Sequence, residues 1–345
     1  MTDAPERPKV ATMFDVARVA GVSHQTVSRV LNDLPGVRPS TRVRVEAAMS
    51  ELRYTPSPAA RTLASRRSQT IGLITAGRPD YGPSNAALGF NEAARAAGYT
   101  VTQVSMREVD TESLRSAVAM MVRHNVSAIV LISGEREVIG AIGSIDLEVP
   151  LVSLASERVD GMHRVAINQF EGGRIAVEHL IGLGHRRIRH VTGLQDAMDA
   201  GERERAWRET LTAHGFPVSG PEIGDWSSES GYVAGVALAE EWRRETERFT
   251  AVFASNDQMA LGLLHAFRDA GIRVPDDVSV VSVDDIPEAA HFAPPLTTLW
   301  QDFDGLGRDI MATVLDVLGD EEHAPDRTTR VPELVVRAST APPPA

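Results

Sequence analysis

The chain has 345 residues, 43% of them hydrophobic, which is enough for a small domain beside a larger one with a substantial core. It has no cysteine, which excludes disulfides, thiolate catalysis and cysteine-ligated zinc. Residues 1–67 carry 11 basic and 6 acidic side chains, whereas the rest of the chain carries 24 and 41, a split that favours a nucleic-acid-binding first domain on an acidic body.

Residues 12–31 show the pattern of a helix-turn-helix. We expect a first helix over about 13–20 with Thr12 as its cap, and a second over about 24–31. The tight turn between them is Ala20-Gly21-Val22-Ser23. Gly21 adopts left-handed backbone angles at little cost, and the Ser23 hydroxyl can cap the second helix.

The second predicted helix has two faces. Val27, Val30 and Leu31 form a buried stripe at helical spacing. The opposite side carries hydrogen-bonding residues and no acid: His24, Gln25, Ser28 and Arg29. Such a helix suits the DNA major groove, where Gln pairs with adenine and Arg with guanine.

A third helix is expected from Pro39, with an apolar stripe formed by Val45, Ala48, Met49 and Leu52. Arg38 precedes the proline, where a serine cap would be stronger, and adds a candidate phosphate contact. Arg53 is a further candidate for such a contact. Tyr54 either closes the small core or contacts the DNA backbone; both interpretations stay open.

The stretches GVSHQTVSRVLN and VEAAMSELRYTPSPAARTLA resemble the LacI/GalR family of bacterial transcription regulators. The resemblance implies a DNA-binding domain over 1–65 with a hinge helix at about 57–64 that orders when two subunits meet on DNA. It implies that Leu63 is an apolar wedge in the minor groove, the alternative being packing against its symmetry mate. The implied DNA-binding residues are Arg18, His24, Gln25, Thr26, Ser28, Arg29, Asn32, Arg42, Tyr54 and Leu63.

From about residue 70 the pattern changes to buried strands alternating with amphipathic helices. Strands are expected at 70–75, 99–104, 127–132, 150–155, 187–193, 250–255 and 277–283. Helices are expected at 86–97, 112–124, 171–183, 202–214, 229–243 and 257–270. Continuous β-branched runs separated by helices predict an α/β body of doubly wound parallel sheets.

This body, over residues 69–338, resembles the periplasmic sugar-binding protein fold. We expect lobe 1 at about 69–167 and 296–322, lobe 2 at about 168–295 and 323–338, and a disordered tail at 339–345. A ligand of such sheets lies beyond the carboxyl ends of the strands, which here means the cleft between the lobes.

Several residues lie at expected strand ends or helix starts where they would reach a ligand in that cleft. Arg203 can fork two hydroxyls, Asn256 can donate to and accept from a hydroxyl pair, and Trp226 offers a flat face to a sugar ring. In the alternative interpretation, Asp284 caps a turn and Trp226 belongs to the core. The effector candidates are Glu171, Arg203, Trp226, Asn256, Asp284, Gln301 and Phe303. Ala76 stands where sugar-responsive relatives often have serine, which leaves the exact sugar open.

The sequence therefore predicts a homodimeric repressor of carbohydrate-utilisation genes that binds near-palindromic operator DNA and is released by a mono- or disaccharide. An activator, or a sugar sensor without a DNA role, are the alternatives. No phosphate-binding loop, H-E-x-x-H or G-x-G-x-x-G after the first strand occurs, so no enzyme, cofactor or metal is expected. No secretory h-region or membrane-length apolar run occurs either, and we expect a cytoplasmic protein. The ending STAPPPA lacks a leucine heptad, which favours dimers over tetramers.

Overall fold

The computed structural model describes residues 11–31, 35–54, 68–106, 110–143, 145–156, 162–244, 246–319 and 329–344. The chain separates into two compact units, Met1–Gln69 and Thr70–Ala345. The expected hinge segment at 57–64, with Leu63, and also Asn32, lie outside the described residues.

The described residues of the first unit form the helices α1 (Met13–Ala20), α2 (His24–Leu31) and α3 (Pro39–Glu51). Thr12 and Asp15 form a reciprocal capping box at the start of α1, and Gly21 ends that helix with φ of 63°. The Ser23 hydroxyl accepts the Thr26 N–H at 3.2 Å, as the turn pattern predicts. The small core contains Val16, Ala17, Ala20, Val27, Val30, Val45 and Ala48, with Leu31, Met49, Leu52 and Tyr54 packed against it.

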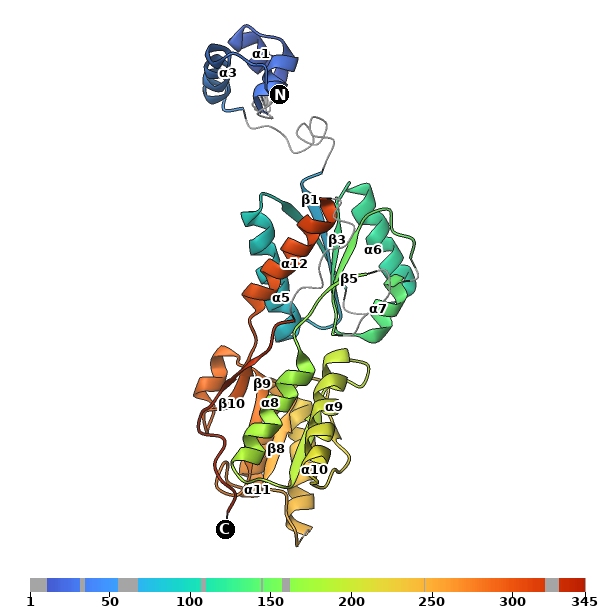
Figure 1. The fold of residues 1–345 in the computed structure, drawn as a ribbon, viewed down its shortest axis with the longest axis vertical. Coiled ribbons are helices and arrows are strands. Elements are labelled where there is room, and N and C mark those ends of the chain that lie inside the picture. The colour runs from blue at the N-terminus through green and yellow to red at the C-terminus, as the bar shows by residue number, and fades with distance from the viewer. Residues whose placement is uncertain are drawn as a thin grey trace, which may run out of the picture. The chain divides into compact units, whose positions relative to one another are not determined.

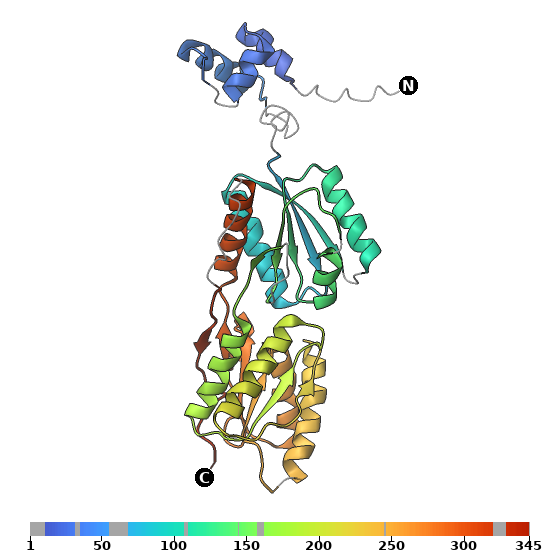
Figure 2. The same cartoon turned by 45° about the vertical axis from the view of Figure 1, so that its right-hand side comes forward.

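The first lobe of the second unit is a five-stranded parallel sheet in the order β2-β1-β3-β4-β5. Its strands are β1 (Thr70–Ala76), β2 (Thr100–Met106), β3 (Ile129–Ile132), β4 (Leu151–Leu154) and β5 (His163–Val165). Helices α5 (Tyr81–Ala96) and α12 (Phe303–Leu318) cover one face, and α6 (Thr111–Arg123) and α7 (Arg136–Gly143) cover the other (Figures 1 and 2).

The second lobe is a six-stranded sheet in the order β11-β10-β9-β8-β6-β7, parallel except for its edge strand β11. Its strands are β6 (Ile188–Thr192), β7 (Glu222–Ile223), β8 (Ala251–Ala254), β9 (Ser279–Asp284), β10 (Thr297–Trp300) and β11 (Glu333–Val335). Its helices are α8 (Gln169–Gly182), α9 (Met198–Ala213), α10 (Ser228–Arg244), α11 (Asp257–Ala270) and the 3₁₀ turn η1 (Pro287–His291).

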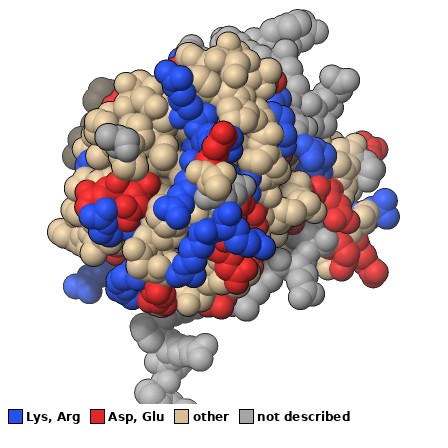
Figure 3. Space-filling model, turned by 90° about the horizontal axis from the view of Figure 1, so that it is seen from below, with Lys and Arg blue, Asp and Glu red and all other residues tan. Residues whose placement is uncertain are grey.

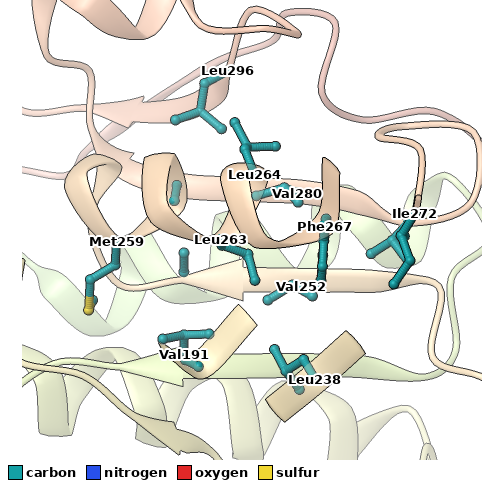
Figure 4. Close-up of a cluster of buried hydrophobic side chains, with 14 of the residues drawn as sticks. Val191, Leu238, Val252, Met259, Leu263, Leu264, Phe267, Ile272, Val280 and Leu296 are labelled. Carbon is teal, nitrogen blue, oxygen red and sulfur yellow. The ribbon is translucent and has the colours of Figure 1, made fainter. Parts of the chain in front are cut away.

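One of the two cores of this lobe lies between α11 and the sheet. Figure 4 shows Leu263 and Phe267 of α11 facing Val252 and Val280 of the strands, with Leu238 of α10 close by. The other core lies on the opposite face, where α8 and α9 pack on the same strands. Parallel strands buried on both faces explain why the sequence shows continuous apolar runs here. The doubly wound fold is therefore confirmed.

The predicted lobe boundary at 296 is wrong. Residues 297–300 form β10, which pairs in parallel with β9 of the second lobe, with Thr297 opposite Val281. The chain returns to the first lobe only after Gln301, where α12 begins. The short strand escapes a periodicity search because only four residues pair and two of them are buried threonines, Thr297 and Thr298.

The prediction of a disordered tail is also wrong for residues 339–344. The Ser339 side chain is fully buried and its hydroxyl donates to the Val280 carbonyl at 2.6 Å. It also accepts the Thr297 N–H at 2.8 Å, and the Ala341 carbonyl accepts from Ser279 at 3.0 Å. These bonds satisfy polar groups at the amino ends of β9 and β10, so the tail is part of the second lobe.

Three crossover segments join the lobes, and Arg330 ties them together. The Arg330 carbonyl accepts the Asn168 N–H at 2.7 Å. Its guanidinium bonds to Asp302 at 2.5 Å and to Asp309 at 2.7 Å. Arg330 in the third crossover therefore contacts the first crossover through its backbone and the second through its side chain.

Candidate functional site

The outward face of α2 is the first candidate site. His24, Gln25 and Arg29 are exposed, Thr26 and Ser28 are half-buried, and Val27 and Val30 are buried. The helix thus buries its apolar edge against α1 and α3 and presents polar side chains outward. That arrangement is the one a recognition helix uses to reach base edges.

The structure gives Arg29 a contact that the pattern did not predict. Its guanidinium donates to the Pro35 carbonyl at 2.5 Å, which ties α2 to the residues that precede α3. Arg18 likewise pairs with Asp15 of its own helix at 2.6 Å. Both side chains remain exposed, so a phosphate or base would compete with these internal partners. Arg38 and Arg53 are exposed, and Arg42 is half-buried. Tyr54 packs against the small core, which favours the first of its two readings.

Phe14 is a surface residue that the sequence reading missed. It is 70% exposed, and its ring centroid lies 5.3 Å from that of His24. Phe14 thus lies next to the polar face of α2 and adds an apolar group to that surface. The sequence signal for its exposure is its position on α1 outside the apolar stripe formed by Val16, Ala17 and Ala20.

The second candidate site is a cavity between the two lobes, at the carboxyl ends of the parallel strands. It contains about 1000 Å³ of space not filled by protein atoms, including space open to solvent. Its wall includes six of the predicted residues, namely Arg203, Trp226, Asn256, Asp284, Gln301 and Phe303. A pocket at this edge of doubly wound sheets is where such folds bind ligands.

Glu171 is not in the cavity wall. Its carboxylate pairs with Arg174 one turn along α8, with 2.5 Å between Oε1 and Nη2. This hydrogen bond lowers the pKa of Glu171, as expected for a carboxylate held by an arginine. The proposed ligand role of Glu171 therefore has no support in the geometry, and its place at the first turn of α8 is a helix-start role.

A chain of hydrogen bonds runs along the base of the cavity. Arg203 donates from Nε and Nη2 to the Gln169 Oε1 atom at 3.0 and 2.8 Å. Gln169 donates to the Gln301 side chain at 2.9 Å, and Gln301 donates to Asp284 at 2.7 Å. Arg203 also donates to the Ser255 carbonyl. The base of the site is thus pre-organised by one polar network, of which Gln169 was not predicted.

Asp284 sits at the end of this chain and is 7% exposed. Burial raises its pKa to about 8; the positive charge of Arg203 opposes this effect, and the charge of Asp257 reinforces it. Asp284 is therefore mostly protonated at pH 7. It is then able to donate as well as accept a hydrogen bond, which suits a hydroxyl ligand.

Asn256 and Trp226 form a second structural unit of the wall. Asn256 accepts the Met259 N–H at 2.9 Å, which caps α11. Its amide donates to the Trp226 carbonyl at 3.0 Å and to Gln258 at 2.9 Å, so its two donors are already used. The Trp226 ring packs where a side chain at Gly193 would overlap it. Asn256 therefore fixes the tryptophan rather than offering free donors.

Backbone strain also collects at this site. Trp226 has φ of 72°, Asp284 of 122° and Asp285 of 52°, angles that residues with a Cβ adopt at a cost. An ion pair with Arg337, at 2.6 Å, holds Asp285 in this conformation. Such strain concentrates at ligand sites, where surrounding contacts maintain it.

The two lobes contact each other around the cavity through residues that the sequence did not single out. Arg78 of lobe 1 pairs with Asp225 of lobe 2 at 3.4 Å. The Met198 N–H donates to the Gly134 carbonyl at 2.9 Å, and Ser156 donates to Asp199. These bonds join the rim of one lobe to the rim of the other, so the cavity is partly closed.

Other chemistry finds no support in the described part of the chain. Those residues contain no cluster of three or more metal-ligating side chains, and none of their helices is long and apolar enough to span a membrane. Figure 3 shows basic and acidic side chains interspersed on one end of the molecule, so no strong field of one sign forms on that face.

Comparison with known proteins places both sites in context. Residues 12–57 match the model "Bacterial regulatory proteins, lacI family", and residues 177–340 match "Periplasmic binding protein-like domain". The chain is 33% identical over 311 residues to the lactose operon repressor of Escherichia coli, covering 90% of this chain and 85% of that one. The chain belongs to the LacI family of bacterial regulatory proteins.

Solved structures of LacI-family proteins agree with this membership. The lac repressor dimer bound to operator and the anti-inducer ONPF has a TM-score of 0.84 at 31% identity, covering 96% of this chain and 100% of that one. The complex of the regulator CelR with cellobiose has a TM-score of 0.68 at 30% identity, covering 95% and 99%. This LacI-family chain is accordingly a DNA-binding transcription regulator and not an enzyme.

Proposed function

We propose that this regulator is a homodimeric, cytoplasmic repressor of carbohydrate-utilisation genes. Each first unit reads half of a near-palindromic operator through α2, and a mono- or disaccharide in the cleft releases the DNA. The observation that carries the proposal is the cleft wall, where a buried Arg203–Gln169–Gln301–Asp284 network faces Trp226. Paired polar groups beside an aromatic ring form a carbohydrate site.

The relatives support this choice of effector. The lac repressor is solved with ONPF and operator, and CelR with cellobiose. This chain shares their fold and has a cavity between its two lobes. Residues of both lobes form the cleft wall, so a bound sugar contacts both lobes and its binding free energy influences how they are arranged.

Coupling between the two sites is reciprocal. If sugar lowers the affinity for operator by some factor, operator lowers the affinity for sugar by the same factor. Equal sugar affinities measured with and without operator DNA would rule out the coupling. The arginines of the first unit contact phosphates in this proposal, so operator affinity falls steeply with salt.

The test of DNA reading is the double variant Gln25→Ala/Arg29→Ala. Each base-pairing side chain contributes about 1–3 kcal/mol, so operator affinity should fall roughly a hundredfold or more. Gel shifts with a promoter fragment and a scrambled fragment measure the loss of selectivity. The control is Arg115→Ala on α6, an exposed arginine of the second unit, which leaves affinity unchanged. Selective binding that survives the double variant contradicts the proposal.

Transcription in the presence and absence of the protein separates the repressor from an activator of the same family. A sugar sensor without a DNA role predicts no selective gel shift at all. The assembly is measured by light scattering, where a homodimer is expected.

A further inference from the structure

The cleft wall contains more acidic than basic side chains. The wall contains four carboxyl groups, those of Asp80, Glu135, Asp199 and Asp284, and two guanidinium groups, those of Arg78 and Arg203. Because Asp284 is mostly protonated at pH 7, three carboxylates face the two guanidinium groups, an excess of one negative charge. A low-dielectric wall strengthens the effect of that excess on a bound charge.

The two arginines are already engaged by the protein. Arg203 uses three of its N–H groups on Gln169 and on the Ser255 carbonyl, and it lies opposite Asp284. Arg78 pairs with Asp225 at 3.4 Å and lies 3.9 Å from Asp80. A ligand phosphate or carboxylate would therefore have to compete with these partners of the protein for the two guanidinium groups.

The helix starts that face the cleft also carry acids of the protein itself. A helix N-terminus attracts anions because its first N–H groups are unpaired. Asp80 occupies the N-cap position of α5, and Asp199 lies in the first turn of α9. Carboxylates of the chain therefore lie at two of the helix starts in this wall.

The surroundings of these acids resist more negative charge. Burial raises the pKa of Asp80, Arg78 opposes the rise, and the nearby Asp225 adds to it. Burial also raises the pKa of Glu135, and the charges of Asp196, Glu137 and Asp80 raise it further. Among the described residues no salt bridge involves Glu135, whose carboxylate lies against the backbone at Gly77. An added anion would face these groups with no free cation to offset them.

We propose that the cleft selects saccharides without acidic groups and rejects their phosphorylated or carboxylated derivatives, with Glu135 as the main determinant of this rejection. The proposal rests on the carbohydrate effector proposed above and narrows its chemical class. Asp80 acts in the same direction, but it also starts α5 and pairs with Arg78. Glu135 is the cleaner residue to change.

The experiment measures binding by isothermal titration calorimetry to the full chain, using matched pairs of probes. These are glucose and glucose 6-phosphate, and cellobiose and lactose with their 6′-phosphates. At least one uncharged sugar should bind about tenfold or more tightly than its phosphate, the size of effect expected for like charges in a partly buried site. The variant Glu135→Gln should narrow that ratio about threefold or more. The matched control is Glu137→Gln, an exposed acid two residues away that is not in the cavity wall, which should leave the ratio as it is.

Each of the other outcomes contradicts one part of the proposal. A phosphate that binds as tightly as its parent sugar overturns the charge selection, and the regulator proposal stands if that phosphate also releases the promoter fragment. A ratio that Glu135→Gln does not change, or that Glu137→Gln changes equally, overturns the role of Glu135. If none of the probes gives a heat of binding while selective DNA binding is intact, the carbohydrate effector is ruled out, and the charge selection with it.

Discussion

On α2 the outward polar side chains, His24, Gln25 and Arg29, are exposed, whereas in the cleft Arg203 and Asp284 are only 4% and 7% exposed. Arg29 has one internal acceptor, the Pro35 carbonyl. Arg203 has two, and both belong to a network that reaches from α9 to the second crossover. Both regions are polar, but only the cleft residues are required to satisfy one another.

The two regions should therefore respond differently to substitution. A buried polar group that loses its partner costs about 1–3 kcal/mol, while an exposed one finds water instead. Substitutions in the cleft should therefore alter stability and ligand binding together. Substitutions on the outward face of α2 should alter DNA binding and leave stability within about 0.5 kcal/mol. Variants that violate this separation would refute the comparison.

The largest effect is expected for Arg203→Met. The change leaves two buried acceptors unpaired, the Gln169 side-chain oxygen and the Ser255 carbonyl. The free energy of unfolding should fall by about 3 kcal/mol, and the sugar response should be lost. Urea unfolding measures the first effect and calorimetry with the bound sugar the second.

Arg205→Met on the same helix is the control for Arg203→Met. Arg205 is 47% exposed and pairs with Glu202 and Glu209 on the surface. Its loss should cost less than about 1 kcal/mol, because exposed ion pairs contribute little. Equal destabilisation by the two variants would show that burial of the network does not matter. Unchanged unfolding in Gln25→Ala/Arg29→Ala completes the comparison with α2.

An intermediate effect is expected from the titration of Asp284. Its folded pKa of about 8 lies above the usual aspartate value, so between about pH 4 and pH 8 the folded state holds a proton that the unfolded state has lost. Stability therefore falls as pH rises through this window. From pH 7 to 8 the loss should be at most about 1.4 kcal/mol, and Asp284→Asn should remove it.

Two other buried groups contribute little over that interval. Burial raises the pKa of Asp257 to about 6 and lowers that of His190 to about 3, so in the folded state both have lost most of their protons by pH 7. The comparison with Asp284→Asn subtracts what remains, including the titration of histidines in the unfolded state. Urea unfolding at pH 7 and 8 gives the slope for each protein. If the wild type and Asp284→Asn lose equal stability over this interval, Asp284 is not the titrating group.

Local features of the fold follow from the sequence, because local chemistry fixes them. The Thr12 and Ser23 caps, the left-handed Gly21 and six of the seven expected buried strands are where their patterns predict. The strand expected at 99–104 forms as β2, but it is an edge strand with no buried residue. Asn256 is instructive, because a polar residue just before a helix is an N-cap signal. Its side-chain oxygen accepts the cap bond from Met259, and its amide donates to the Trp226 carbonyl and to Gln258, so it has no donor left for a ligand.

The partners of the cleft residues could not be predicted in the same way. Gln169 and Gln301 are 132 positions apart, and Arg78 and Asp225 are 147 apart. No periodicity encodes which glutamine meets which, since the folded crossovers decide it. The tail was misjudged for a related reason. Its prolines suggest disorder, but Ser339 finds its acceptors on the sheet only after folding.

The smallest effect is expected for Arg78→Gln, which removes the Arg78–Asp225 ion pair between the lobes. Bonds from Ser227 lower the pKa of Asp225 to about 2, so its carboxylate is charged at every physiological pH. Both side chains are nearly half-exposed, at 48% and 44%, so the pair contributes less than about 1 kcal/mol. Sugar affinity should fall less than about fivefold, through faster release, because the remaining rim contacts still join the lobes. The difference from the wild type should shrink in 1 M salt, where exposed charges are screened beyond about 3 Å. Stopped-flow release rates at low and high salt measure both points. A salt-independent loss would mean that Arg78 contacts the sugar directly, and the cleft would then have a free cation after all.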